Sequence, residues 1–315
     1  MRALWPRRTR RLLAGATALI AISPVLAAPA SEAATPSQSG GRIAFASTRA
    51  GGDAEIFVMN ADGSNLRQIT YNDGDDHSPD WAPDGRRIVF VHEPPDQTNA
   101  DLHIVDTVTG VEREFTSWRY WYETDPAWSP DGMWIAFASK HPDGDGGDII
   151  ALSVDGERSR YIAVQQENST NVDPGWSPDG KKLVFIEYYD SYDLYTTRFC
   201  CSHGYKRRTV TNDGLKEWHP EWSPDGDRIL FSRSAALFKH GLYTITPDGK
   251  DLRVVFEGPL DARSGTWSPD GEAIAFYAQG GLGYDIYRIN ADGTGLVRLT
   301  DQAGSDQHPD WSPVG

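Results

Sequence analysis

Short apolar runs recur along the chain, and most of them follow the same polar turn. The turn reads Trp-Ser-Pro-Asp-Gly or a close variant, and its six copies begin 44 to 48 residues apart, at Trp81, Trp128, Trp176, Trp222, Trp267 and Trp311. Proline presets the first dihedral of a turn and Asp-Gly tolerates positive φ, so each copy predicts a strand end and a chain reversal. The apolar run that follows contains a phenylalanine, such as Phe90 or Phe276, and its length predicts a short, buried β-strand.

Two further strands are predicted in each repeat. A third strand opens with an acid and an aliphatic residue in most repeats, as in Glu55-Ile56 and Asp285-Ile286. A second Asp-Gly turn then leads into a fourth strand, such as residues 296–300. Antiparallel strands repeated with this period predict propeller blades. The predicted fold class is therefore all-β, a six-bladed β-propeller of four-stranded antiparallel blades.

The two ends of the chain hold complementary parts of one repeat. The sixth motif ends at Gly315 with no strands after it, whereas the first strand, residues 43–47, has no motif before it. We expect residues 308–312 to supply the innermost strand of this blade and residues 43–70 its three outer strands. Pairing of the N- and C-terminal strands would close the ring and leave no open sheet edge.

The first 33 residues follow the pattern of a secretory signal peptide. Five arginines precede an apolar stretch at residues 12–26, and small residues follow it. The stretch is shorter than the roughly 20 residues of a membrane-spanning helix, so we expect an exported protein without a membrane span, outside the cell or in the periplasm. Residues 34–40 would form a linker and residues 41–315 the propeller. The arginines fit either a Sec or a twin-arginine signal, so the export route stays open.

The charge of the chain argues against a nucleic-acid partner. The formal net charge of the 315-residue chain is −15, and removal of the leader with its five Arg and one Glu takes it to −19. No stripe of Lys and Arg is present that could replace the counterions of phosphates. Acidity of this degree favours solubility outside the cell, and we expect a monomer.

The repeat resembles that of the TolB-type six-bladed propellers, a WD40-like family with the PD40 repeat. The resemblance rests on Pro-x-Trp-Ser-Pro-Asp-Gly, then Ile-Ala-Phe, Asp-Ile-Tyr, Asp-Gly and Arg-x-Leu-Thr, and it covers the chain after the leader. It implies the propeller alone, without the N-terminal α/β domain of TolB. Peptidases with similar repeats carry a Gly-x-Ser-x-Gly elbow, which this sequence lacks.

One face of the predicted propeller differs from blade to blade. This variable face carries the loops between second and third strands and the loops between blades, and such loops usually bind ligands. One inter-blade loop is strongly aromatic: Trp118, Arg119, Tyr120, Trp121 and Tyr122. Trp218 lies in an equivalent loop near Tyr188, Tyr189 and Tyr192, and Arg263 is placed to receive an acidic group. We expect these residues to bind a protein or peptide, or to stack on sugar rings; the alternative is that the aromatic residues only pack over the blade edge.

Two positions before the repeated tryptophan are rich in metal-ligating residue types. Five residues before it stand Asp76, Glu123, Glu217 and Asp306, and three residues before it stand Asp125, Asp173, His219 and His308. Alternation along a strand predicts that both positions face the central channel. The oxygen-rich set suits Ca²⁺, whereas the histidines suit a transition metal. The alternative is a ring of solvated acids with histidines that only form hydrogen bonds within the strands.

No residue is singled out as catalytic, and we expect a binding module rather than an enzyme. The enzymatic alternative is a polysaccharide lyase or glycosidase with a metal at the channel mouth, because carboxylates and histidines gather there. The two cysteines, Cys200 and Cys201, replace the Asp-Gly turn of their repeat. In an exported protein they form either a strained vicinal disulfide or two thiols in an atypical turn.

Overall fold

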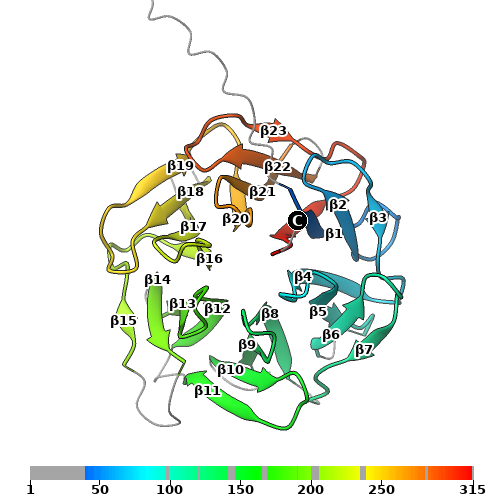
Figure 1. The fold of residues 1–315 in the computed structure, drawn as a ribbon, viewed down its shortest axis with the longest axis horizontal. Coiled ribbons are helices and arrows are strands. Elements are labelled where there is room, and N and C mark those ends of the chain that lie inside the picture. The colour runs from blue at the N-terminus through cyan, green and yellow to red at the C-terminus, as the bar shows by residue number, and fades with distance from the viewer. Residues whose placement is uncertain are drawn as a thin grey trace, which may run out of the picture. The chain divides into compact units, whose positions relative to one another are not determined.

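Six four-stranded antiparallel sheets are arranged as blades around a common central axis (Figure 1). The computed structural model describes residues 40–96, 99–118, 121–140, 146–164, 169–189, 191–199, 206–234, 239–280 and 283–313, all within the unit Ala33–Gly315. Arg119, Tyr120 and both cysteines lie outside the described residues, as does the predicted leader. Among the described residues, no helix has the length and apolarity needed to span a membrane.

The strands of each blade follow one another outwards from the channel. Blade 1 contains β24 (Asp306–Trp311), β1 (Arg42–Ser47), β2 (Glu55–Asn60) and β3 (Arg67–Gln68). Blade 2 contains β4 (Asp75–Trp81), β5 (Arg87–Glu93), β6 (Asp101–Asp106) and β7 (Glu112–Glu114). Blade 3 contains β8 (Tyr122–Trp128), β9 (Trp134–Lys140), β10 (Gly147–Ser153) and β11 (Ser159–Ala163).

The other three blades repeat this order. Blade 4 contains β12 (Thr170–Trp176), β13 (Lys182–Tyr188), β14 (Tyr192–Arg198) and β15 (Arg208–Thr209). Blade 5 contains β16 (Glu217–Trp222), β17 (Ile229–Ser234), β18 (His240–Ile245) and β19 (Arg253–Phe256). Blade 6 contains β20 (Ala262–Trp267), β21 (Ala273–Gln279), β22 (Tyr284–Asn290) and β23 (Val297–Arg298). The predicted fold class is confirmed.

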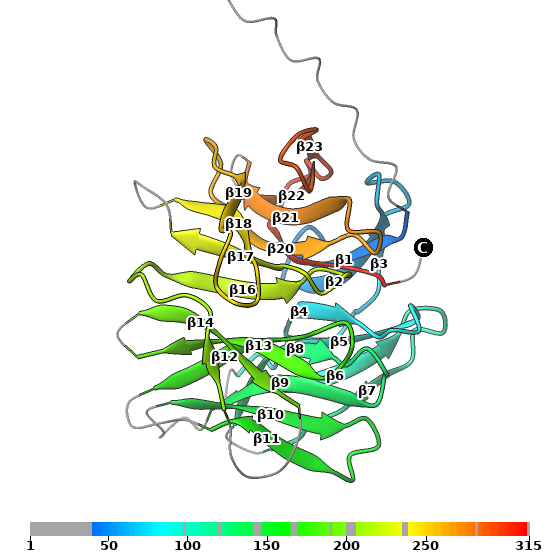
Figure 2. The same cartoon turned by 60° about the vertical axis from the view of Figure 1, so that its left-hand side comes forward.

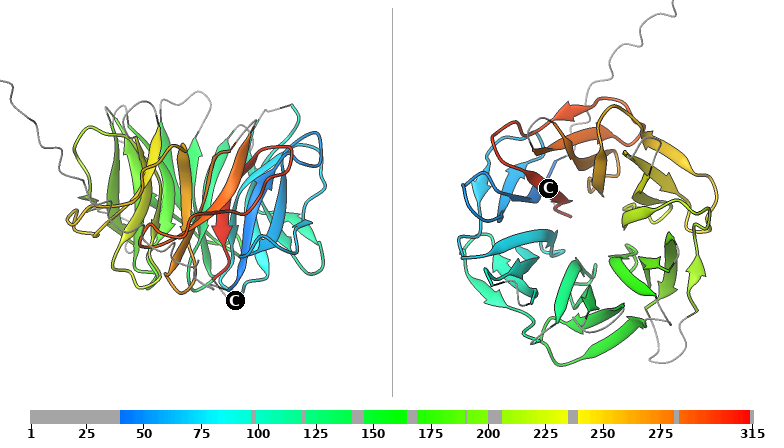
Figure 3. Two further views of the ribbon diagram at one scale, coloured as in Figure 1. Left: turned by 90° about the horizontal axis from the view of Figure 1, so that it is seen from above. Right: turned by 180° about the vertical axis from the view of Figure 1, so that it is seen from behind.

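Blade 1 joins the two ends of the described chain. β24 pairs antiparallel with β1, so that Ile43 lies opposite Trp311 and Ser47 opposite Asp306. The Ser47 hydroxyl donates a hydrogen bond of 2.6 Å to the Asp306 carboxylate across the two strands. Figures 2 and 3 show β1 in blue beside β24 in red. The predicted closure by N- and C-terminal strands is therefore confirmed.

The hydrophobic core lies between neighbouring blades. The central phenylalanine of every second strand is completely buried: Phe45, Phe90, Phe137, Phe185, Phe231 and Phe276. The tryptophan of each motif is buried as well, and Trp81 packs against Ile56 and Val58 of blade 1 as well as Phe90 of its own blade. Burial of a phenylalanine side chain stabilises the fold by about 1.5 to 3 kcal/mol. The repeated motif therefore serves mainly to hold adjacent blades together.

Candidate binding site at the central channel

Every innermost strand contains one extra residue, three positions before its tryptophan. This residue has a positive φ of 47° to 53° in all six strands: Ser78, Asp125, Asp173, His219, Ser264 and His308. The pairing with the second strand shifts at the same place, as between His77 and Asp80 in β4. A β-bulge of this kind reverses the alternation of the side chains that follow it. Six residues other than glycine accept this left-handed conformation, which usually costs about 1 to 2 kcal/mol each, so the bulge is a built-in feature of the blade.

The bulge overturns the prediction that the positions five and three residues before the tryptophan share a face. The four acids at the first position are at most 2% exposed and lie inside the blades: Asp76, Glu123, Glu217 and Asp306. Asp306 forms an ion pair with Arg49, and Glu217 pairs with Arg233 at 3.0 Å. The prediction that these four acids line the channel is wrong, because the extra residue turns them away from it.

These buried acids meet carboxyl groups of the preceding blade. Burial and the carboxylate of Asp76 raise the pKa of Glu55 to about 7, although the Thr70 hydroxyl donates to Glu55 at 2.6 Å. Burial and Asp101 likewise raise the pKa of Glu123 to about 8. The same two positions hold Gly241 and Ala262 at the boundary of blades 5 and 6, so both acids are missing there together. At the boundary of blades 3 and 4 only one of the two positions is acidic, because they hold Asp148 and Asn171, so the two acids can also be lost separately.

The channel is lined by residues at and beyond the bulge. They enclose a cavity of about 400 Å³ to which all six blades contribute. The bulge residues form one tier, and the residues directly before the tryptophans form a second tier: Asp80, Ala127, Gly175, Glu221, Thr266 and Asp310. Blades 3 and 4 carry their acid in the bulge tier, as Asp125 and Asp173, whereas blades 1, 2 and 5 carry it in the second tier. Five blades thus place one carboxyl group each in the lining of the cavity.

Four of these carboxylates tie one blade to the next. Asp80 accepts a hydrogen bond of 2.8 Å from the backbone N–H of Trp128, and Asp310 accepts one of 2.7 Å from that of Trp81. Glu221 accepts one of 3.2 Å from Trp267, and Asp173 accepts one of 2.9 Å from His219. The channel acids therefore contribute to the structure whether or not a ligand is bound.

The acids of the channel also repel one another. Burial and the carboxylate of Asp173 raise the pKa of Asp125 to about 7. In the second tier, burial and Asp310 together raise the pKa of Asp80 and of Glu221 well above the usual range. Carboxylates brought together in this way become more stable when a cation offsets their charge.

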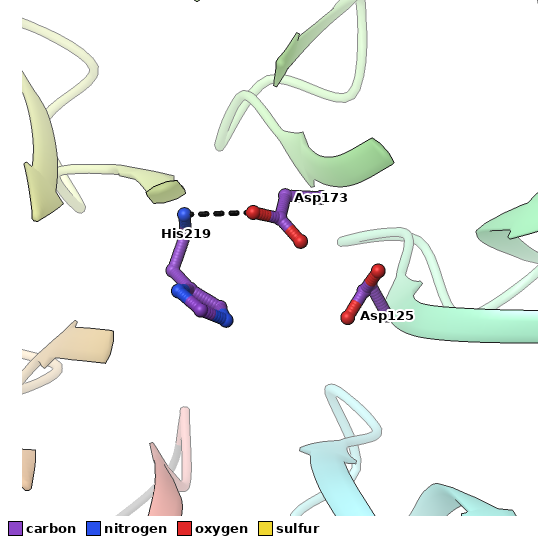
Figure 4. A group of neighbouring side chains, drawn as sticks. All are labelled: Asp125, Asp173 and His219. Carbon is purple, nitrogen blue, oxygen red and sulfur yellow. Dashed lines mark hydrogen bonds between the residues drawn. The ribbon is translucent and has the colours of Figure 1, made fainter. Parts of the chain in front are cut away.

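Three of the predicted metal-ligating residues come together, as Figure 4 shows. Asp125, Asp173 and His219 project from β8, β12 and β16, and each offers a ligand atom within 4.8 Å of the others. Within the described part of the chain, no other group of three His, Cys, Asp or Glu residues comes as close. The Nδ1 atom of His219 is buried without a hydrogen-bond partner among these residues. Two carboxylates with one imidazole fit Zn²⁺ or Mn²⁺ better than Ca²⁺, which takes six to eight oxygen ligands.

His308 lies beside this group. Its ring centroid is 5.8 Å from that of His219 and 6.0 Å from that of His77. Burial and the neighbouring His219 hold the pKa of His308 well below its usual range, so its imidazole stays neutral. A neutral imidazole is the form that binds metals. His308 is nevertheless not a member of the group formed by Asp125, Asp173 and His219.

The aromatic loop that begins at Trp118 is partly used for packing. The Trp118 ring lies 5.7 Å from the Phe137 ring, and both Trp118 and Tyr122 pack against the core between blades 2 and 3. Trp121 is half-buried, and its backbone N–H donates a hydrogen bond to the Trp118 carbonyl. The packing alternative therefore accounts for two of the three aromatic residues described in this loop.

A different set of rings forms a continuous row on the variable face. This ring row consists of Tyr188, Tyr192, Trp218 and His240, with successive centroids 4.4, 5.6 and 4.6 Å apart. It crosses from blade 4 to blade 5, and its Trp218 member lies on the innermost strand β16, directly before His219 of the cavity lining. The sequence points to Trp218 but not to His240, because only the packing of the blade brings these two side chains together. The available signal was the pair Tyr188 and Tyr192, which flanks the connection between β13 and β14.

Arg263 lies at the same mouth but already has a partner. Its Nε atom donates a hydrogen bond of 2.9 Å to Oδ2 of Asp261, and its Nη2 atom lies 2.8 Å from the same oxygen in an ion pair. Its guanidinium carbon also lies 6.0 Å from the centre of the Tyr284 ring. Asp261 therefore already neutralises the charge of Arg263, the residue that we expected to receive an acidic group of the ligand.

Comparison with known proteins points to one family. A model of the TolB beta propeller domain family (PD40) matches residues 94–268. A Tol-Pal system protein TolB of Geobacter metallireducens is 39% identical over 88 residues, which cover 28% of this chain but only 20% of the relative.

Solved structures show the same fold at lower identity. TolB from Acinetobacter baumannii superposes with a TM-score of 0.74 and 19% identity, over 86% of this chain and 66% of that protein. An oligogalacturonate lyase in complex with manganese superposes with a TM-score of 0.57 and 16% identity, over 82% of this chain and 73% of the lyase. Identities this low show that the fold is shared, but they carry no statement about the chemistry of the site.

Proposed function

The chain belongs to the TolB β-propeller domain family, and on that basis we propose that it is an exported protein that binds a protein or peptide through its variable face. The secretory pattern of residues 1–33 supports export, to the cell envelope or beyond it. The curated relative is by name a protein of the Tol-Pal system, which fits a role in association with other proteins. Cell fractionation followed by N-terminal sequencing tests the export step, and protein found only in the cytoplasm with residue 1 intact would contradict it.

The ring row beside the channel mouth is the observation that carries the binding proposal. Tyr188 and Tyr189 are 41% and 57% exposed, and Trp218 is half-buried at the edge of the mouth. Aromatic residues are enriched where proteins bind each other, because they bury a large area at a small cost in side-chain entropy. On the opposite face, the turn acids are used internally: Asp131, for example, accepts a hydrogen bond from Ser129 at 2.6 Å.

Site-specific photo-cross-linking in the native host tests this proposal. A photoreactive phenylalanine analogue replaces Trp218 on the variable face or, as the matched control, Met133, which is 52% exposed on the opposite face. We expect a defined adduct from position 218 and none from position 133. Equal adducts from both positions, or an adduct from position 133 alone, would contradict binding through the variable face.

A second candidate function is carbohydrate binding or cleavage with a metal at the channel. The group of Asp125, Asp173 and His219 favours it, because these residues would hold the ion while the ion polarises a hydroxyl or carboxylate of the sugar. The test incubates the protein and Mn²⁺ with polysaccharides and measures new reducing ends and the absorbance of unsaturated uronates. Asp125→Asn combined with Asp173→Asn should abolish any activity, and activity that survives this change would rule out the metal group.

A further inference from the structure

We propose that the peptide bound by the variable face is basic, with an arginine or lysine side chain stacked on the ring row and further cations directed towards the channel acids. The inference rests on the proposed function, because it specifies the chemistry of the peptide partner. Two independent features carry it: exposed aromatic faces at the mouth and a cavity whose lining has only one sign of formal charge.

The rings of the row present faces that attract cations. Tyr188 and Tyr192 lie opposite each other at the ends of β13 and β14, and their rings are stacked with an angle of 30° between the planes. The Trp218 ring continues the stack at 37° to Tyr192. The face of an aromatic ring carries partial negative charge, so an ammonium or guanidinium group is favoured over it.

The protein already places one cation of its own on this row. The Lys216 ammonium lies 5.2 Å from the centre of the Tyr192 ring, and Lys216 is exposed. Cations stack on aromatic rings elsewhere in the fold too, as Arg42 does on Trp81 at 4.6 Å. Lys216 therefore marks the kind of group that the row accepts, and it competes with a cation of the partner for the same ring.

The charge of the cavity selects a basic partner over an acidic one. Its lining contains five carboxyl groups and two histidines, and no Lys or Arg is among the described residues that form it. The cavity begins next to the row, because Trp218 directly precedes His219 on β16 and His219 lines the cavity. An acidic peptide would bring like charges together, whereas a basic peptide offsets the repulsion among the channel acids.

Arg263, the second cation considered at this face, does not reverse this choice. Arg263 is paired with Asp261 by a hydrogen bond and an ion-pair contact, so the charges of these two side chains offset each other. A neutral aromatic peptide would stack on the rings but would gain nothing from the carboxylates. Arginine should bind better than lysine, because its planar guanidinium stacks on rings as well as pairing with carboxylates.

The test measures fluorescence anisotropy of labelled hexa-arginine, hexa-lysine, hexa-glutamate and a neutral Gly-Ser peptide with the purified protein. We expect hexa-arginine to bind most tightly, hexa-lysine next and hexa-glutamate not at all. Tyr188→Ser should weaken hexa-arginine binding about two- to five-fold, the value of one exposed cation–π contact. Lys216→Ala should tighten it, because it removes both a competing cation and a repulsive charge.

A control separates this site from general attraction to an acidic protein. Tyr161→Ser removes another exposed ring, 51% exposed on the outer strand β11, and should leave the affinity unchanged. If Tyr188→Ser and Tyr161→Ser have equal effects, or if Lys216→Ala weakens binding, the inference is wrong. Peptide mapping of the adduct at position 218 distinguishes the two levels: an acidic or neutral partner segment would refute the basic peptide while the proposed function stands, and no adduct would refute both.

Discussion

Replacement of Glu55 by glutamine should stabilise the protein by an amount that grows with pH. Glu55 is 5% exposed at the boundary of blades 1 and 2, and burial together with Asp76 raises its pKa from 4.5 to about 7. The folded protein therefore holds this proton more tightly than the unfolded chain does. Its contribution to stability is complete below pH 4.5 and is lost as the pH rises through about 7. Glutamine keeps the shape of the protonated side chain and carries no charge at any pH.

The size of the effect follows from the shift in pKa. Each pKa unit corresponds to about 1.36 kcal/mol, so linkage between the values of 4.5 and about 7 gives about 1 kcal/mol at pH 5 and about 3 kcal/mol at pH 7. The advantage of Glu55→Gln over the wild type should therefore grow by about 2 kcal/mol between these pH values. The Thr70 hydroxyl can still donate to the glutamine carbonyl oxygen, as it now does to Glu55.

Urea unfolding at pH 5, 6 and 7 measures this difference directly. Glu157→Gln, at an exposed turn, is the matched control for the loss of one carboxylate. Parallel pH profiles for the wild type and Glu55→Gln would show that Glu55 titrates alike in the folded and unfolded states. The account of the acid pairs would then fail.

Three further outcomes are expected. Deletion of residues 305–315 should abolish cooperative unfolding, because β24 supplies the innermost strand of blade 1; an unchanged melting temperature and near-UV circular dichroism would contradict this. Millimolar Mn²⁺ should raise the melting temperature more than Mg²⁺ does. The double variant Asp125→Asn with Asp173→Asn should remove this shift, whereas Glu123→Gln should not. Absence of a shift in the wild type would contradict a metal site at these residues. Trp118→Ala should cost about 2 kcal/mol of stability, from lost burial against Phe137, and leave peptide binding intact; weaker binding at unchanged stability would restore the aromatic loop as a binding surface.

The sequence was sufficient to predict the blades and their closure. The period, the two turns of each repeat and the incomplete repeats at the two ends follow from residue types whose backbone preferences are local, such as Asp131-Gly132 before β9. Closure then required only that unpaired strand edges find each other, as Ile43 and Trp311 do. The prediction of the blades and of their closure therefore does not depend on the exact register of the strands.

The orientation of the channel residues was not predictable in the same way. A single extra residue reverses which side chains face the channel, and simple alternation cannot show where that residue lies. A signal was present, however: a proline stands two residues before the tryptophan in five repeats, as at Pro79 and Pro309. Proline has no N–H for the ladder, so inside a strand it indicates a bulge or an edge. A bulge at this proline predicts that Asp80, Glu221 and Asp310 line the channel and that Glu123 and Glu217 do not.

The double use of the channel acids limits how any ligand can act on this fold. Asp173 accepts a hydrogen bond from the backbone N–H of His219 across the boundary of blades 4 and 5, and it also belongs to the group of three that faces the cavity. A ligand that draws on the charge of Asp173 therefore changes the strength of a contact between blades. Substitution by alanine would remove both roles at once, whereas asparagine keeps an oxygen for the His219 N–H and removes only the charge. The difference between these two variants in stability and in binding thus separates the structural contribution of the carboxylate from its contribution to recognition.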